Sequence, residues 1–539
     1  MDLSHIFTDN YSTIPFVAAY AEMHYRFKFM GSRYFLNEPE IIADIPYRIN
    51  PKQKMPVLIL VKDSHHFPVL LNSYTIKIAQ NGEIIFSSSD SIDKEIKQPW
   101  WQLDAFVDVI GIAGLISIDV TVDYTINEKR KSCINHNLPL LPNRALSCLV
   151  AESGLPGPSG LVWGDLHYHT NLTDDMVEFG APLDSTLLAA RAIGLDFYCC
   201  TDHSYDLDDL PGSWSKTDPE LTKWNHSRQQ IIEINENNPE CIIASEEVTV
   251  RNKRGRNVHA LLLNNKKFIP GSGDGAEKMI PFSSEHSTSD IYELIEDNSI
   301  LIAAHPLTPV PLFQWLFVKR GKWMWDDLTQ PGLTGMQILN GALDTGFYKG
   351  RDIWIKLLLS GYKKYIFAGN DAHGNFNIFR QIKTPMISLH EKNEQVFGDC
   401  RTGIISSSRS QPDILDGIKS GNCIITNGPF INLVISSNGI NAKLGETVSF
   451  DIFEINLDGI SSSEFGRIVD FKLFKGIIGE DLENCIIHKS NSHATYNISI
   501  KDNFRYSQDC YYRGEILTID SGGIERMGMT NPIWIRKSN

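Results

Sequence analysis

Histidine and acidic side chains that could bind metal ions gather in the middle of the sequence. His167 and His169 stand two positions apart in Gly164-Asp-Leu-His-Tyr-His-Thr170, at the end of an apolar run. Alternate side chains of an extended strand share one face, so both imidazoles should point the same way. Neutral imidazole is a common ligand of divalent metals. The spacing therefore predicts two convergent metal ligands, and Asp174 follows shortly after them.

The other candidates also lie mostly where a short apolar strand is expected to end. They are Asp202 and His203 in Cys200-Thr-Asp-His203, Glu247 in Ser245-Glu-Glu-Val-Thr249, His259, His305 before Pro306, and Asp371 and His373 in Gly369-Asn-Asp-Ala-His373. One such histidine alone is more often a core residue bonded to backbone. A whole series interleaved with carboxylates favours a metal site.

The elements that must position these residues alternate between strand and helix from Leu161 to about Gly428. Strands are expected at 161–165, 196–200, 241–250, 258–263, 300–304, 335–339 and 365–369, and helices at 184–193, 221–235, 289–297 and 351–360. Such alternation predicts an α/β domain with a largely parallel sheet, either open or closed into a barrel.

His259 departs from this pattern because it would begin its strand rather than end it. A hairpin between 247–250 and 258–263 would resolve the conflict. Pairing about Lys253 at its centre would bring His259 level with Glu247. Arg251, Lys253, Arg254 and Arg256 would then form a solvated basic turn, unless one of them reaches a substrate anion.

The sequence pattern of the two flanking stretches differs from that of the centre. Strand-like alternation from Ile41 to Val150 predicts an N-terminal β-sandwich, and Ser153–Gly160 is rich in Gly and Pro and is interpreted as a linker. Alternation returns after residue 431 and predicts a smaller C-terminal β-sandwich. The expected domains are therefore 1–160, 161–430 and 431–539.

Composition restricts partners and compartment. The 539 residues include 65 acidic and 50 basic side chains, so the net charge is −15, which disfavours broad binding of nucleic acid. Nine cysteines without a C-x-x-C motif indicate reduced thiols. Neither a signal peptide nor a membrane-spanning run is recognisable, so we expect a cytoplasmic protein without a membrane partner. The oligomeric state stays open.

The ordered motifs D-L-H-x-H-T, T-D-H, an acidic strand end, a lone His, A-H-P and D-A-H resemble the PHP (polymerase and histidinol phosphatase) domain. The resemblance covers roughly residues 161–430 and includes all nine ligand positions of that family in order. It implies a distorted seven-stranded (β/α) barrel with two or three divalent ions, commonly zinc, manganese or iron. Pro412–Pro429 and Asn531-Pro-Ile-Trp534 resemble the CehA/McbA-type branch of the family.

The resemblance also implies a ligand set. One metal would be held by His167, His169, Glu247 and Asp371, a second by Glu247, His259 and His305, and a third by Asp174, His203 and His373. Glu247 is preferred to Glu246 because the family's Glu precedes an aliphatic residue and then Ser or Thr. Asp202 is interpreted as a group that orients an imidazole, with a simple turn carboxylate as the alternative.

These assignments predict a metal-dependent hydrolase that acts on a small, anionic ester, foremost a phosphoester. A metal-bridging hydroxide near Glu247 would attack, and His203 or His373 would protonate the leaving group. Trp315, Trp323 and Trp325 would form a lid or pack against the N-terminal sandwich. The alternatives are a carboxylester or carbamate hydrolase on the same scaffold, and a non-catalytic binding module with a structural metal site.

Overall fold

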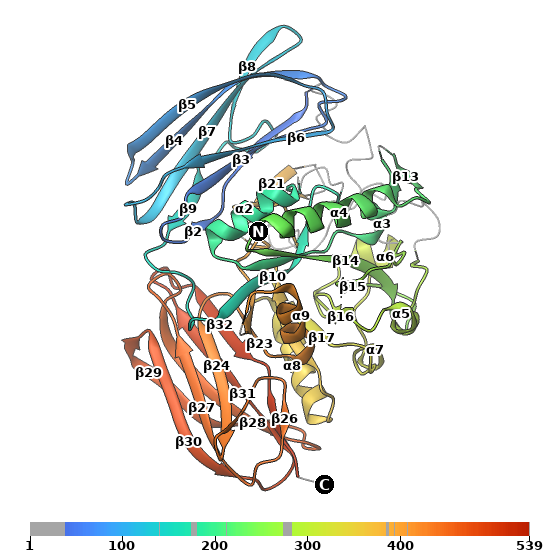
Figure 1. Cartoon of the computed structure of the whole chain (residues 1–539), viewed down its shortest axis with the longest axis vertical. Coiled ribbons are helices and arrows are strands. Elements are labelled where there is room, and N and C mark those ends of the chain that lie inside the picture. Colours follow the sequence, from blue (N-terminus) through green and yellow to red (C-terminus); the bar gives the residue numbers. More distant parts are fainter. Residues whose placement is uncertain are drawn as a thin grey trace, which may run out of the picture.

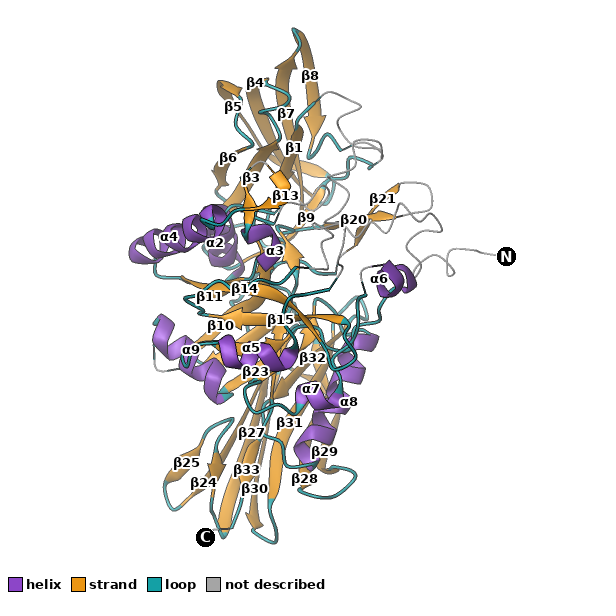
Figure 2. Ribbon diagram, turned by 90° about the vertical axis from the view of Figure 1, so that its right-hand side faces the viewer, coloured by secondary structure: helices purple, strands orange, loops and turns teal. Residues whose placement is uncertain are grey.

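The computed structural model describes residues 38–138, 141–173, 180–211, 213–272, 283–317, 319–383, 388–392, 394–406 and 408–537. Strands of the N-terminal part lie at one end of the molecule and strands of the C-terminal part lie at the other (Figure 1). The part that contains the helices lies between them, as the view turned by 90° also shows (Figure 2). Two sandwich-like regions therefore flank a mixed central region.

The N-terminal part consists of two sheets, ordered β1-β3-β6 and β2-β9-β7-β4-β5, with β8 paired to β7. Its strands are β1 (Glu40–Asp44), β2 (Arg48–Ile49), β3 (Met55–Lys62), β4 (Val69–Gln80), β5 (Glu83–Ile96), β6 (Trp100–Val107), β7 (Gly114–Ile126), β8 (Lys129–Ile134) and β9 (Leu146–Val150). In β7 every second residue is buried, including Ile116, Ile118 and Val120. This alternation places one apolar face against the shared core, as a sandwich requires.

The central part contains a run of hydrogen-bonded strands in the order β10-β11-β14-β15-β16-β17-β18. These are β10 (Leu161–His169), β11 (Phe197–Cys200), β14 (Cys241–Arg251), β15 (Asn257–Leu263), β16 (Ile300–Ala303), β17 (Gly335–Asn340) and β18 (Tyr365–Gly369). All neighbours in the run pair in parallel except where β15 meets β14 and β16. The expectation of a largely parallel sheet thus holds for this run apart from β15, whereas β22 (Arg401–Ile405) and β23 (Cys423–Thr426) extend the sheet beyond β10 in antiparallel fashion.

The end of this run returns to its beginning. Strand β19 (Ala372–His373) follows β18 and pairs in parallel with β10, opposite Tyr168 and His169. The backbone N–H of Asp371 donates to the carbonyl of His167 at 2.9 Å. The first and last strands of the run therefore present their ends to the same space.

Helices of the central part connect these strands. They are α2 (Leu183–Ile193), α3 (Ser204–Leu207), α4 (Thr222–Asn237), α5 (Thr288–Leu294), α6 (Leu312–Phe317), α7 (Trp325–Leu328), α8 (Thr345–Leu359) and α9 (Gln411–Ser420). Helix α8 begins six residues before the predicted start, because Asp344 caps it by accepting from the N–H of Phe347 at 2.8 Å. Among the described residues no helix is long and apolar enough to cross a membrane.

The predicted hairpin is formed by β14 and β15, but its register differs from the expected one. Thr249 lies opposite His259, and Glu247 lies opposite Leu261. The turn centres on Arg254 rather than Lys253, because Asn252 closes it by bonding to Arg256 and Gly255. A one-residue shift of the centre moves the pairing by two residues. Since two is the period of a strand, Glu247 and His259 still share a face.

The C-terminal part continues the central sheet. Strand β23 (Cys423–Thr426) pairs with β32, and the sheet then runs through β31, β28 and β29. The parts on either side of the predicted boundary at residue 430 therefore share one sheet. The second sheet is ordered β25-β24-β27-β30.

The strands of this C-terminal part are β24 (Phe430–Ser437), β25 (Ile440–Ala442), β26 (Thr447–Val448), β27 (Ile452–Ile460), β28 (Arg467–Ile477), β29 (Asn484–Thr495), β30 (Asn497–Arg505), β31 (Cys510–Ile519), β32 (Glu525–Thr530) and β33 (Ile533–Ile535). The remaining central strands are β12 (Asp209–Leu210), β13 (Ser213–Thr217), β20 (Phe379–Lys383), β21 (Ser388–Lys392) and β22 (Arg401–Ile405). The chain as a whole is thus β-rich, and the α/β class predicted for it applies only to the centre, because both flanks are built from strands.

Candidate metal centre

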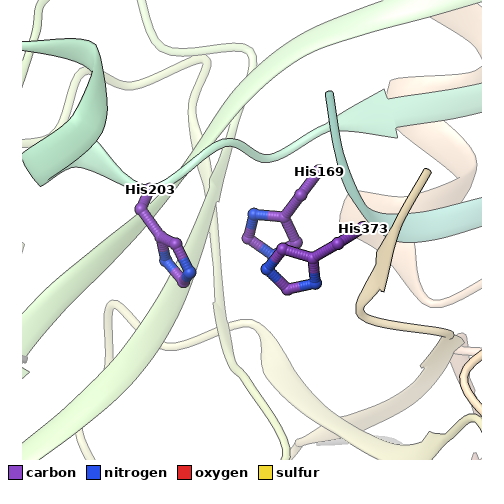
Figure 3. A group of neighbouring side chains, drawn as sticks. All are labelled: His169, His203 and His373. Atoms are coloured by element: carbon purple, nitrogen blue, oxygen red, sulfur yellow. The ribbon is translucent and has the colours of Figure 1, made fainter. Parts of the chain in front are cut away.

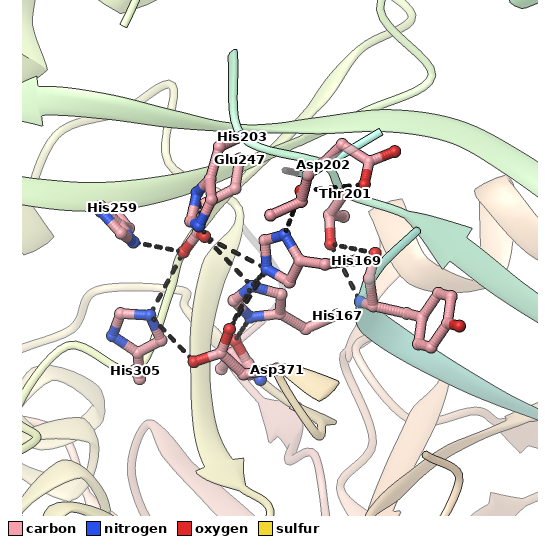
Figure 4. Close-up of polar contacts among 12 residues, drawn as sticks. His167, His169, Thr201, Asp202, His203, Glu247, His259, His305 and Asp371 are labelled. Carbon is pink, nitrogen blue, oxygen red and sulfur yellow. Dashed lines mark hydrogen bonds and ion pairs between the residues drawn. The ribbon is translucent and has the colours of Figure 1, made fainter. Parts of the chain in front are cut away.

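Four side chains from three parts of the central sheet converge on one point (Figure 4). The Nε2 atoms of His167 and His169, on β10, lie 3.1 Å apart. Oδ1 of Asp371 lies 3.2 Å from each of these nitrogens, and Oε2 of Glu247 lies 3.4 Å from each. Two imidazoles and two carboxylates within this range can surround one divalent ion.

Glu247 connects this point to the neighbouring histidines. Its Oε1 lies 2.7 Å from Nδ1 of His259 and 3.2 Å from Nε2 of His305, and its Oε2 lies 3.0 Å from Nδ1 of His203. The side chain is fully buried. Glu246 points to the opposite face of β14, where it accepts hydrogen bonds from Asn265 and from the N–H of Ile269. The geometry therefore agrees with the choice of Glu247 over Glu246.

A third group consists of His169, His203 and His373, whose rings face one another (Figure 3). The rings of His169 and His373 stack with centroids 4.1 Å apart, and those of His169 and His203 are 4.4 Å apart. Asp174, the other predicted ligand of this group, lies outside the described residues. Three imidazoles, from β10, from β19 and from the residues that follow β11, thus meet beside the first point of convergence.

The hydrogen bonds on the far side of two imidazoles test whether these residues fit a metal. Nδ1 of His167 lies 2.9 Å from Oε1 of Gln337, which only accepts. Nδ1 of His169 lies 3.3 Å from Oγ1 of Thr173, which itself donates to Asp202. Both Nδ1 atoms therefore carry a hydrogen, and in the neutral rings both Nε2 atoms present lone pairs toward the same point. Lone pairs that converge in this way fit a shared cation, as in metal sites whose outer partners fix the histidine tautomer.

The charges of the two carboxylates are also suited to metal binding. Burial opposes ionisation of Glu247, but His259 and His167 outweigh this effect and hold its pKa well below its usual value. Burial also opposes ionisation of the half-buried Asp371, but His167 and His169 hold its pKa well below its usual value. Metal ligands must be deprotonated, so both side chains are in the form that coordinates.

Two of the predicted ligands have an unusual backbone. His305 has a φ of 28° and Asp371 a φ of 54°, both in the left-handed region that non-glycine residues seldom adopt. Each follows closely after the end of its strand, β16 or β18. Such conformations cost about 1–3 kcal/mol and cluster at functional sites. Here they turn both side chains toward Glu247 and the Nε2 atoms.

Asp202, interpreted from the sequence as a group that orients an imidazole, is linked to the imidazole of His169 through Thr173. Its carboxylate accepts from the backbone N–H of Thr170 at 2.6 Å, from Oγ1 of Thr170 at 2.8 Å and from Oγ1 of Thr173 at 3.0 Å. It therefore acts on His169, and only through Thr173. The hydroxyl of Thr173 is held so that it accepts from His169 Nδ1.

The sequence did not single out Arg320, Gln337 or Asn340, which border the cluster. NH1 of Arg320 lies 2.7 Å from Nε2 of His259. Arg256 of the predicted basic turn instead stacks over Trp315 at 3.9 Å. Single basic or amide residues in loops and strands carry no spacing signal that would have identified them.

The aromatic segment after His305 does not behave as one unit. Trp323 is buried, and its Nε1 donates to the carbonyl of His259 at 3.0 Å, so it supports β15 from within. Trp315 on α6 is 43% exposed. The three tryptophans therefore do not form one lid.

No model of a known protein family matches the sequence, and no curated protein matches it. Comparison of structures gives a glycosyl hydrolase family 2 member from Bacteroides cellulosilyticus, with 10% identity, a TM-score of 0.17 and coverage of 93% of this chain and 63% of the other. It also gives a beta-glucuronidase from Bacteroides uniformis, with 8% identity, a TM-score of 0.18 and coverage of 92% and 60%. The chain spans less than two thirds of the length of these proteins. Similarity at such TM-scores does not establish a shared fold.

Proposed function

We propose that this chain is a metal-dependent hydrolase of the PHP type, close to the CehA/McbA-type branch, and that it cleaves phosphoesters. The observation that carries the proposal is the convergence of the His167 and His169 Nε2 lone pairs with Glu247 and Asp371. In the neutral rings these two lone pairs face each other, so the pair requires either a proton or a metal ion between the two nitrogens.

The proposed scaffold is the distorted seven-stranded (β/α) barrel of that family. Its strands would be β10, β11, β14, β15, β16, β17 and β18, and the pairing of β19 with β10 supports closure of the ring. Most of the proposed ligands that the structure describes lie at strand ends or just beyond them, as expected for a site at one mouth of a barrel, whereas Glu247 lies within β14. The antiparallel β15 accounts for the distortion.

Two or three divalent ions, zinc, manganese or iron, would be held by His167, His169, Asp174, His203, Glu247, His259, His305, Asp371 and His373. When bound, such ions lower the pKa of water and stabilise charge that develops in the transition state. The chain's own residues do the remainder. Glu247 holds the ligands of two sites together, and His203 or His373 stands at the edge where a leaving group would need a proton.

A phosphoester is favoured over a neutral ester because the site contains a fixed cation of its own. The guanidinium of Arg320 lies beside His259 and is charged at every physiological pH. Together with the bound ions it would attract and orient an anionic substrate. A neutral carboxylester would meet this charge only through the oxyanion of its transition state, whereas a phosphoester would also use it for binding.

The proposal is tested with purified protein, first by metal analysis and then with aryl phosphate monoesters, phosphodiesters, aryl acetates and aryl glycosides, each with manganese, zinc or iron. We expect stoichiometric metal and turnover of phosphoesters, and loss of both in His167→Ala with the fold retained by circular dichroism. Turnover of acetates alone would replace the phosphoester assignment with the carboxylester alternative. Metal without any turnover would leave a binding module, and a protein without metal would overturn the proposal.

A further inference from the structure

Strand β17 supplies none of the proposed metal ligands, although it lies between β16 and β18, which each lead to one. Its contribution to the cluster consists of two amides, Gln337 and Asn340. We propose that Gln337 and Asn340 are positioning residues that couple Asp371 to His167 and hold His167 with its lone pair on Nε2. This inference rests on the proposed metal site.

The orientation of both amides follows from the carboxylate at one end of the chain of contacts. Oδ2 of Asp371 can only accept, so Asn340 must present its NH2 group there, at 3.4 Å. Oδ1 of Asn340 then accepts from Nε2 of Gln337 at 2.8 Å. Oε1 of Gln337 is left to face Nδ1 of His167 at 2.9 Å. Each link fixes the next, and the last link places the hydrogen of His167 on Nδ1.

A local irregularity of β17 makes this arrangement possible. Gln337 and Asn340 are three positions apart, so on a regular strand they would point to opposite faces. The pairing of β17 with β18 shifts between Gln337 and Leu339, so one extra residue is accommodated there. A bulge of this kind reverses the alternation of the residues that follow it, so that both amides face the cluster. Bulges near functional sites commonly redirect side chains in this way.

The contacts from Asp371 through Asn340 and Gln337 to His167 form an amide relay, and its burial makes it sensitive to substitution. Gln337 is fully buried, and its amide oxygen and nitrogen both have partners within the relay. Outer partners of metal-bound histidines fix the ring and its tautomer, and their removal typically lowers metal affinity about 10–100-fold. The expected consequence is therefore a defect in metal binding rather than in substrate binding.

The test compares Gln337→Met, Gln337→Glu and Asn340→Ala with the wild-type chain. Metal affinity is measured by competition with a chromophoric chelator, using zinc and manganese, alongside kcat, KM and Tm. We expect Gln337→Met to lose about 10–100-fold in affinity for the tightest-bound ion, with KM little changed. Gln337→Glu retains an acceptor for His167 and should recover most of the affinity. The double variant Gln337→Met/Asn340→Ala should be little worse than Gln337→Met alone, because one relay carries both effects.

Met336→Ala is the matched control, since Met336 is a buried apolar residue of the same strand that precedes the bulge. It should lower Tm and leave metal affinity unchanged. Wild-type affinity in Gln337→Met, or an equal loss of affinity in Met336→Ala, would overturn the relay. If the wild-type chain binds neither metal, it is the proposed function that fails, so the two failures can be distinguished.

Discussion

The guanidinium of Arg320 lies against the imidazole of His259 and contacts both of its ring nitrogens, Nε2 more closely than Nδ1. NH1 of the guanidinium lies 2.7 Å from Nε2 of the imidazole, and a guanidinium can only donate. Nε2 therefore accepts, and the hydrogen on Nδ1 is directed to Glu247 Oε1, 2.7 Å away. In this form His259 has no lone pair left for a metal. The contact with Arg320 and coordination of a metal by Nε2 of His259 therefore exclude each other, so a metal bound there would displace the guanidinium from this imidazole.

Replacing Arg320 should accordingly weaken substrate binding. For Arg320→Met we expect KM for an aryl phosphate to rise about 10–100-fold, the effect of one hydrogen bond to a charged group. Binding of the metal at His259 should become tighter, as measured by calorimetric titration. Arg256→Met is the matched control, because Arg256 contacts Trp315 instead of the cluster. An unchanged KM in Arg320→Met would remove Arg320 from the substrate site.

Glu246 and Glu247 are adjacent but lie on opposite faces of β14, so replacing each by Gln should affect metal binding differently. Glu247→Gln removes the carboxylate that lies within 3.4 Å of His167, His169 and His203. We expect it to lose bound metal and to lower kcat/KM at least about 100-fold. Glu246→Gln should keep its metal, measured by plasma mass spectrometry on both variants. Equal metal content in the two variants would contradict the central role of Glu247.

A buried arginine connects the N-terminal part, helix α2 and the C-terminal part. Arg48 is fully buried, pairs with Glu464 at 2.7 Å and also donates to the carbonyl of Ile193. For Arg48→Met we expect a lower Tm and a loss of about 3–5 kcal/mol in the free energy of unfolding, because Glu464 is left without its cation. Arg409→Met breaks the exposed pair with Asp196 and should have an effect below about 1 kcal/mol. Similar Tm values for the two variants would argue against the connecting role.

The stability of the chain should depend on pH through Lys364. Burial lowers the pKa of Lys364 to about 8, from 10.5, while its Nζ donates to the carbonyl of Leu333 at 2.6 Å. Between these two pKa values the unfolded chain binds the proton and the folded chain does not, so stability rises with pH in that window. We expect wild type to gain up to about 1.4 kcal/mol per pH unit relative to Lys364→Met. Tm values measured at pH 7.5 and 9.5 check this, and a constant difference would contradict it.

Much of the central region could be predicted because strand ends carry strong local signals. The strands that lead to His167, Glu247 and Asp371 are short apolar runs followed by a polar residue or a turn, and each occurs near its predicted place. The register of the β14–β15 hairpin was missed because it depends on how Asn252 closes the turn, a detail of three-dimensional hydrogen bonding. The early start of α8 was missed because Asp344 was not recognised as its cap.

The residues around the ligands could not be predicted for a different reason. Gln337 reaches His167 only because β17 has a bulge, and a sequence gives no direct sign of a bulge. Arg320 is brought beside β15 by backbone bonds from Asn257 to Lys319 and Gly321, far along the chain. Asp202 was expected to orient an imidazole, and the contact through Thr173 links it to that of His169. The local sequence pattern thus identified the candidate ligands, whereas the residues that hydrogen-bond to them depend on tertiary contacts.

The pairing between the central and C-terminal parts has a consequence for biosynthesis. The side-chain oxygen of Asn531 accepts from the backbone N–H of Ile366 on β18 at 2.8 Å, across 165 positions of sequence. During translation β18 leaves the ribosome before Asn531 does. Until Asn531 has also emerged, β18 lacks this hydrogen bond. The segment that bears Asp371 and His373 reaches its final geometry late in translation, so premature capture of ions by an incomplete polypeptide is disfavoured.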